Sequence, residues 1–155
     1  MVEGRVAEHL FLTDYRLQPI IDYRHTENGG YPDDDYRGLI DRVLAADTLV
    51  FATPIYWYGI SGLLKTFIDR WSQSLVENRP AFLAGLAGKQ AYVIAVGDDD
   101  PHLKGQPLIQ QFQSIFDFVG IDFAGYVLGT ANTPGDILRD KEALAKVDSW
   151  RDNWT

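Results

Sequence analysis

The feature that most constrains the fold is a series of short, almost wholly apolar segments separated by amphipathic ones. Residues 48–52, 91–96 and 125–128 are apolar or small nearly throughout. Such runs are typical of strands in a parallel sheet that helices cover on both faces. Residues 6–12 predict a fourth strand. Because these strands alternate with helical segments, the sequence predicts a three-layer α/β fold.

The amphipathic segments carry apolar residues three and four positions apart, which indicates helices with one buried face. We expect helices over residues 36–44, from Ser61 to about Leu75, over 108–119 and over 140–150. Acidic residues 33–35 suit the start of the first helix, and Ser61 is a typical residue to cap the second. Residues 13–33 form a long polar and aromatic loop.

Composition narrows the class of protein. The 155 residues suit one domain, residues 1–155, and 46% of them are hydrophobic, which excludes wholesale disorder. A net charge of −8 without a basic stripe argues against nucleic-acid binding, and no apolar run is long enough to cross a membrane. The chain has no cysteine, which excludes thiol chemistry and fits a cytoplasmic protein. No histidine and carboxylate set has metal-ligand spacing, so we predict no metal site.

The segment after residue 52 is where we expect chemistry. It reads TPIYWYG, residues 53–59. Ligands of open α/β sheets bind beyond the carboxyl ends of the strands, so this loop borders the expected site. We expect Pro54 to end the strand and Gly59 to permit a positive φ or a close approach. Aromatic rings held there suit a flat aromatic ligand, although they would equally suit a lid on the core or a subunit contact.

The run LVFATPIYW at residues 49–57, continued by SGLLKTFIDRW at residues 61–71, resembles the signature of the NAD(P)H-dependent FMN reductases. Residues 90–97 and 125–136 are similar to the fourth and fifth strands of that family. The resemblance covers the chain from about residue 6 onward. It implies a flavodoxin-like fold, FMN as cofactor and NAD(P)H as co-substrate. A quinone or another small oxidised compound would then accept the electrons.

Carried over position by position, the resemblance implies a flavin site on the loops after two strands. Its lining residues would be Thr53, Pro54, Ile55, Tyr56, Trp57, Gly97 and Asp98. The flavin carries the hydride, so no catalytic acid or base is assigned. Enzymes of this kind are homodimers or homotetramers with the flavin near the interface.

The chain departs from the family at its beginning, where members have a first, central strand and a phosphate-binding loop. Residues 1–4 are similar to the last turn of the helix that follows that loop. In the strand order 2-1-3-4-5 the missing strand leaves a gap of about 10 Å. Residues 6–12 would shift to pair with 48–52, another chain would fill the gap, or the native chain would start about 30 residues upstream. We favour the upstream start.

Two consequences follow from this departure. Without the phosphate loop we expect FMN to bind weakly. Two alternatives to a reductase also stay open: a flavodoxin-like module that lost FMN and uses its aromatic loop for protein contacts, and an electron carrier that does not use NAD(P)H.

Overall fold

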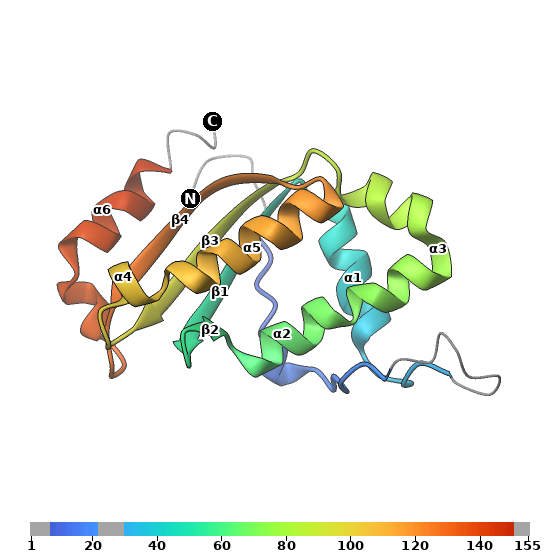
Figure 1. Ribbon diagram of the computed structural model, residues 1–155, viewed down its shortest axis with the longest axis horizontal. Helices are drawn as coiled ribbons and strands as arrows, with labels where there is room; N and C mark the ends of the chain where they lie inside the picture. The colour runs from blue at the N-terminus through green and yellow to red at the C-terminus, as the bar shows by residue number, and fades with distance from the viewer. Residues whose placement is uncertain (1–6, 22–29, 151–155) are drawn as a thin grey trace.

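The computed structural model describes residues 7–21 and 30–150. Four strands form one sheet in the order β2-β1-β3-β4 (Figure 1). Strands β1, β3 and β4 are parallel, and β2 pairs antiparallel with the end of β1. The strands are β1 (Thr48–Tyr56), β2 (Gly59–Ile60), β3 (Gln90–Gly97) and β4 (Asp122–Thr130). The α-helices are α1 (Tyr36–Ala45), α2 (Gly62–Asp69), α3 (Trp71–Leu86), α4 (Pro101–Lys104), α5 (Gln106–Val119) and α6 (Lys141–Ser149).

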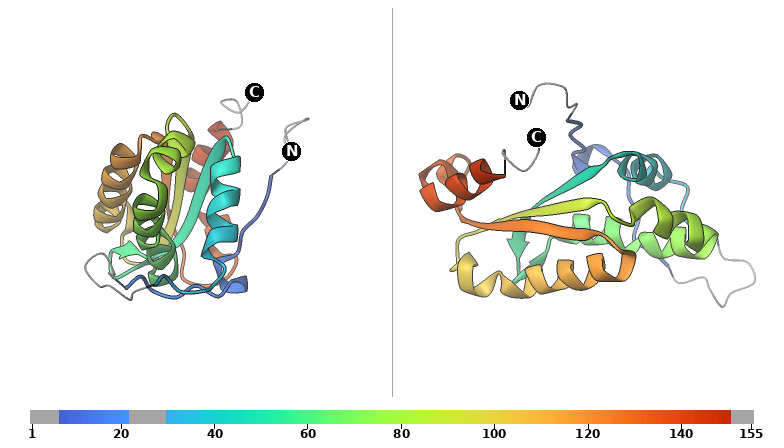
Figure 2. Two further views of the ribbon diagram at one scale, coloured as in Figure 1. Left: turned by 90° about the vertical axis from the view of Figure 1, so that its right-hand side faces the viewer. Right: turned by 90° about the horizontal axis from the view of Figure 1, so that it is seen from above.

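Helices cover both faces of this sheet, so the predicted three-layer α/β architecture is confirmed. Figure 2 shows α5 and α6 on opposite sides of the strands. The larger core joins α1, α2, α3 and α5 to one face of the sheet. At its centre, the ring of Phe51 lies 5.6 Å from that of Phe112 and 5.5 Å from that of Phe116. On the other face, α6 brings Trp150 to 4.7 Å from Tyr92.

The strand predicted for residues 6–12 is not formed in its described part. Residues 7–11 have no regular structure, and Leu12–Asp14 form the 3-10 turn η1. Leu10 and Leu12 still pack against the larger core. A strand is stable only where its backbone groups pair, and no described strand pairs with this segment. Residues 1–6, and with them the predicted helix end at residues 1–4, lie outside the described residues.

Coverage of β1 on both faces was also a wrong prediction. Its side chains alternate between buried and exposed, and Val50 is 47% exposed. The face that carries Val50 is the one on which α6 packs, but α6 contacts β4 and the Tyr92 side of β3. The apolar run in β1 therefore has one buried and one open face.

The helix predictions hold, with differences in detail. The segment after Ser61 forms two helices, α2 and α3, that meet at Arg70. Ser61 is the residue before α2, but its side chain makes no capping hydrogen bond. At α6 the side chain of Asp140 does accept a hydrogen bond from the backbone N–H of Ala143. Among the described residues, the helices are too short or too polar to cross a lipid bilayer.

Candidate functional site

The site is built on a hairpin turn between β1 and β2. Strand β1 continues through Pro54 to Tyr56, so the prediction that Pro54 ends the strand was wrong. Proline is tolerated here because this part of β1 lies toward the edge of the sheet. The chain then turns at Trp57 and Tyr58, with φ values of 48° and 63°. The positive φ falls on these two aromatic residues and not on Gly59, which starts β2.

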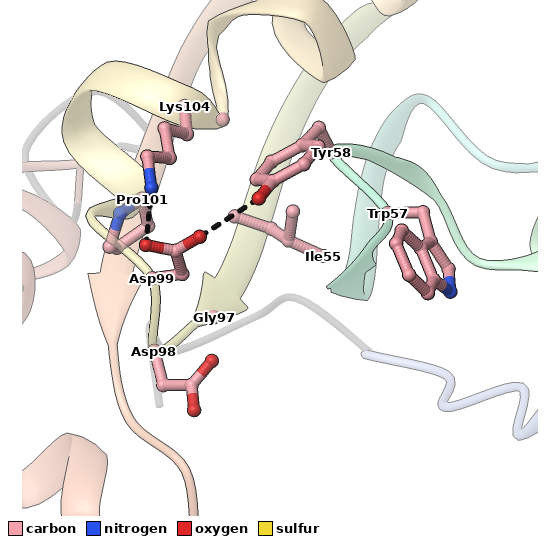
Figure 3. A pocket seen from close by; sticks show the side chains of 9 residues that line it. Ile55, Trp57, Tyr58, Gly97, Asp98, Asp99, Pro101 and Lys104 are labelled. Carbon is pink, nitrogen blue, oxygen red and sulfur yellow. Dashed lines mark hydrogen bonds and ion pairs between the residues drawn. The ribbon is translucent and has the colours of Figure 1, made fainter.

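Two left-handed residues in succession are what a two-residue hairpin of type I′ requires. Glycine and asparagine usually fill these places, because a bulky side chain is disfavoured there. Aromatic residues at both positions therefore carry backbone strain, and such strain is common at ligand sites. The turn sends the two side chains in different directions: Tyr58 points toward the loop after β3, and Trp57 points away from it (Figure 3).

A cavity of about 150 Å³ lies between this turn and the loop that follows β3. Both loops leave the carboxyl ends of neighbouring parallel strands, with Pro54 in register with Val96. Ile55 and Gly97 are the lining residues that the strands contribute (Figure 3). The full lining is Ile55, Trp57, Tyr58, Gly97, Asp98, Asp99, Pro101, Lys104 and Gly105.

Glycine at two of these positions follows from close packing around Ile55. A Cβ on Gly97 would lie 3.2 Å from the Cβ of Ile55. A Cβ on Gly105 would lie 2.5 Å from the carbonyl oxygen of Pro101 and 3.2 Å from Cδ1 of Ile55. Side chains at these places would displace Ile55, which forms one wall of the cavity.

Three polar side chains join the two loops across the cavity mouth. The hydroxyl of Tyr58 donates a hydrogen bond to Oδ2 of Asp99 at 2.9 Å, and Nζ of Lys104 donates to Oδ1 at 2.5 Å. The Lys104 ammonium also lies 6.0 Å from the centre of the Tyr58 ring. Hydrogen bonds from Lys104 and Tyr58 lower the pKa of Asp99. The same carboxylate raises the pKa of both Tyr58 and Lys104, so all three groups keep their usual charge at neutral pH.

The structure brings together four of the seven residues predicted to bind the cofactor. Ile55, Trp57, Gly97 and Asp98 line the cavity. The other three, Thr53, Pro54 and Tyr56, do not line it. Thr53 is 6% exposed, and its hydroxyl donates to the Pro54 carbonyl at 3.0 Å and accepts from the Ser61 N–H at 3.3 Å. That pattern fixes the start of α2. Pro54 and Tyr56 are exposed on the opposite face of β1.

Sequence reasoning missed five lining residues: Tyr58, Asp99, Pro101, Lys104 and Gly105. Tyr58 and Asp99 adjoin predicted residues, and their aromatic and acidic neighbours were a signal for them. Lys104 reaches the cavity only because α4 is a single short turn that folds back over Asp99. No sequence pattern indicated that contact.

The cavity suits the ring of a flavin better than its phosphate. Tyr58 and the 95% exposed Trp57 offer aromatic surface beside an apolar wall formed by Ile55 and Gly97. Asp98, Asp99 and Asp100 form the loop after β3, where their negative charges would repel a phosphate, and Lys104 already pairs with Asp99. Among the described residues we find no glycine-rich turn between a strand and a helix N-terminus at this cavity, which is the usual cradle for a phosphate. Within the same residues no group of three metal-ligating side chains is close enough to hold a metal ion.

Comparisons with known proteins identify the family of the chain. A family described as having a flavodoxin-like fold matches residues 5–152. The chain is 58% identical over 146 residues, 93% of its length, to the "Putative NAD(P)H-dependent FMN-containing oxidoreductase YwqN" of Bacillus subtilis, of which it covers 81%. It is 31% identical over 124 residues to the FMN-dependent NADH:quinone oxidoreductase of Alcanivorax borkumensis. That match covers 72% of this chain and 58% of the relative.

Among solved structures, the Trp repressor binding protein of Bacillus subtilis superposes with a TM-score of 0.69. It is 61% identical, and the match covers 72% of each chain. The sequence and family matches extend over nearly the whole chain, and the structural match covers 72% of it. The chain therefore belongs to the flavodoxin-like family that includes NAD(P)H-dependent FMN oxidoreductases.

Proposed function

We propose that this protein is a flavin-dependent NAD(P)H oxidoreductase that passes electrons from NAD(P)H through FMN to a quinone or another small oxidised acceptor. The observation that carries the proposal is the 58% identity to YwqN over 146 residues. The aromatic hairpin beside a cavity at the carboxyl ends of β1 and β3 is the structural support. In an open parallel sheet this edge is where ligands bind.

The roles of the chain's own residues follow from the cavity. Ile55 and Gly97 would form the surface against which the flavin ring lies, and Trp57 would stack on or border it. Asp98 would approach the ring from the loop after β3. Thr53, Pro54 and Tyr56 complete the proposed site by holding the strand end that presents the hairpin. When bound, FMN supplies hydride acceptance and donation, so the chain needs to bind, orient and shield it, and no side-chain acid or base is assigned.

The proposal extends to the setting of the protein. We propose a cytoplasmic homodimer or homotetramer without nucleic-acid or membrane partners. The absence of cysteine fits the reducing cytoplasm. The acidic net charge of −8 argues against a nucleic-acid partner. The exposed rings of Trp57 and Tyr56 support a subunit contact near the cavity, because aromatic residues are enriched in interfaces. Light scattering coupled to size-exclusion chromatography measures the assembly state.

Flavin titration followed by turnover tests the function. We expect the protein to quench FMN fluorescence saturably at one flavin per chain. The loaded protein should then oxidise NADH or NADPH and reduce a benzoquinone acceptor. A Val76→Ala variant is a suitable control, because Val76 is exposed on α3 and is not a lining residue. Saturable binding without pyridine-nucleotide oxidation would instead identify an electron carrier, and absence of saturable binding would indicate a module without flavin.

A further inference from the structure

We propose that Tyr58, Asp99 and Lys104 form a clasp that sets the width of the cavity, and that they act as positioning residues for the flavin. This inference rests on the proposed function. The clasp deepens that proposal because it assigns a role to three residues that lie beside the predicted flavin contacts without being among them.

The first step of the argument is the strain in the hairpin turn. Trp57 and Tyr58 both adopt left-handed φ values, which disfavours this turn relative to others that the chain could form. Only two residue pairs, Ile55 with Ile60 and Tyr56 with Gly59, join β1 to β2. So short a hairpin is marginal by itself. Contacts beyond this pairing therefore hold the turn in its observed shape, and the burial of Ile60 in the larger core is one of them.

The clasp is a second such contact, and it joins the turn to the loop after β3. Tyr58 comes from the strained turn, and Asp99 comes from the loop after β3, 41 positions further along the chain. Lys104 holds the second oxygen of Asp99, so both carboxylate oxygens are engaged. Asp100, next to Asp99, also has a positive φ of 47°, which means that both joined loops are strained. A single bond between two strained loops fixes each of them through the other.

The anchoring end of the clasp is rigid. The N–H of Lys104 donates to the carbonyl of Asp100 at 2.8 Å, and Gly105 donates to Pro101 at 2.9 Å. Pro101 and Gly105 are buried against the sheet. Lys104 therefore starts from a backbone that hydrogen bonds hold in place. Its ion pair with Asp99 is an exposed one, with side chains 44% and 56% exposed, so a modest effect is expected from breaking it.

The position of the clasp explains what it controls. All three residues line the cavity, and the loops that they join form its two sides (Figure 3). A flat ring between these loops is held only if their separation stays constant, because stacking depends on close contact. Without the clasp, the turn that carries Trp57 would move independently of the loop that carries Asp98.

The test uses the full chain with two readouts. The variants are Tyr58→Phe, which removes only the hydroxyl, Asp99→Ala, Lys104→Met and the double variant Tyr58→Phe with Asp99→Ala. Lys65→Met is the matched control, because it removes a partly exposed ion pair of similar length, 2.5 Å to Asp69, away from the cavity. Riboflavin and FMN are the ligands, and hydrogen exchange of the ligand-free protein is the second readout.

We expect each clasp variant to weaken binding of both riboflavin and FMN by about threefold to fivefold. The double variant should weaken it no more than the stronger single one, because both changes break one clasp. Exchange should rise over residues 56–60 and 97–101 together, and Lys65→Met should change neither readout. Thermal stability should change little, which separates positioning from general unfolding.

Three results would overturn the clasp. If its charges act directly on the FMN phosphate, Asp99→Ala and Lys104→Met would change FMN affinity in opposite directions and leave riboflavin affinity unchanged. If the contact does not join the loops, exchange would rise in one segment only or in neither. If the variants loosen both loops but bind flavin as tightly as the wild type, positioning is wrong. Failure of the wild type to bind flavin would overturn the proposed function, while the exchange result still decides whether the two loops are joined.

Discussion

At the scale of single residues, the conformation of the hairpin turn lowers the stability of the fold while it presents an aromatic ring to the proposed flavin site. Trp57 is 95% exposed with a φ of 48°, so it gains little from burial and pays for its conformation. A left-handed conformation costs a non-glycine residue about 1–2 kcal/mol, of which glycine's greater freedom in the unfolded chain offsets about 0.5–1 kcal/mol. Trp57→Gly should therefore leave the free energy of unfolding unchanged or raise it by up to about 1.5 kcal/mol, and should weaken flavin binding.

Tyr56→Gly is the control for this prediction. Tyr56 is also exposed, at 63%, but it lies in β1 with an extended backbone. Glycine there should lower the free energy of unfolding by about 0.5–1 kcal/mol. Urea denaturation of both variants measures the difference. A larger loss of stability for Trp57→Gly than for Tyr56→Gly would contradict the assignment of strain to the turn.

At the scale of elements, a buried ion pair joins the segment before α1 to the junction of α2 and α3. Arg70 and Asp34 have side chains that are 0% and 1% exposed, with Nη1 of Arg70 2.6 Å from Oδ2 of Asp34. Arg70 also donates to the Gln18 carbonyl at 3.0 Å and to Oε1 of Gln73 at 2.6 Å. Asp34→Ala leaves the Arg70 charge buried and should lower the free energy of unfolding by about 3–5 kcal/mol.

The exposed pair Lys65–Asp69 provides the comparison for Asp34→Ala. Its side chains are 36% and 42% exposed, so Asp69→Ala should cost less than about 1 kcal/mol. Chemical denaturation at pH 7 measures both variants. If Asp34→Ala and Asp69→Ala lower the free energy of unfolding equally, the prediction is wrong, because water would then solvate the Arg70 charge in place of Asp34.

The same pair predicts how stability depends on pH. Burial raises the pKa of Asp34, but hydrogen bonds from Arg70 and from the N–H groups of Gln18 and Tyr36 outweigh it, and the pKa is lowered. A lowered folded-state pKa contributes stability that is complete above the unfolded value of about 3.9 and is lost as the pH falls through the folded value. Asp34→Asn should therefore be less stable at pH 7 and lose less stability than the wild type between about pH 5 and pH 2. Identical acid profiles would contradict this.

The elements also mark how far the sequence predicts the structure. The apolar pattern predicted α1, α5 and α6 and the strands β1, β3 and β4, because the spacing of apolar residues follows from which face of a helix or strand is buried. Residues 6–12 carried the same signal, yet a strand needs a partner that the segment's own residues cannot supply. In the site, the loop after residue 52 was predicted, but the cavity also depends on Lys104 and Gly105. Their contacts arise from the packing of α4 on the sheet, which no local pattern encodes.

At the scale of the whole molecule, helices cover one face of the sheet fully and the other face only in part, and the edge of the sheet at β1 is largely unpaired. Between Thr48 and Pro54, β1 pairs with β3 on one edge, and no described strand pairs with its other edge. Val50 is 47% exposed on the face that α6 leaves uncovered. An apolar strand with a free edge promotes association between molecules, and a lysine on such an edge suppresses it.

Val50→Lys therefore tests whether this open region makes the protein associate. Because the side chain is half exposed, the free energy of unfolding should change by no more than about 0.5 kcal/mol. Concentration-dependent light scattering should fall relative to the wild type. Val76→Lys is the matched control: Val76 is 54% exposed but lies on α3, so the added charge is the same and the sheet edge is untouched. If both variants reduce scattering equally, the net charge governs association and the β1 edge does not. A large loss of stability in Val50→Lys would mean that the face carrying Val50 is covered.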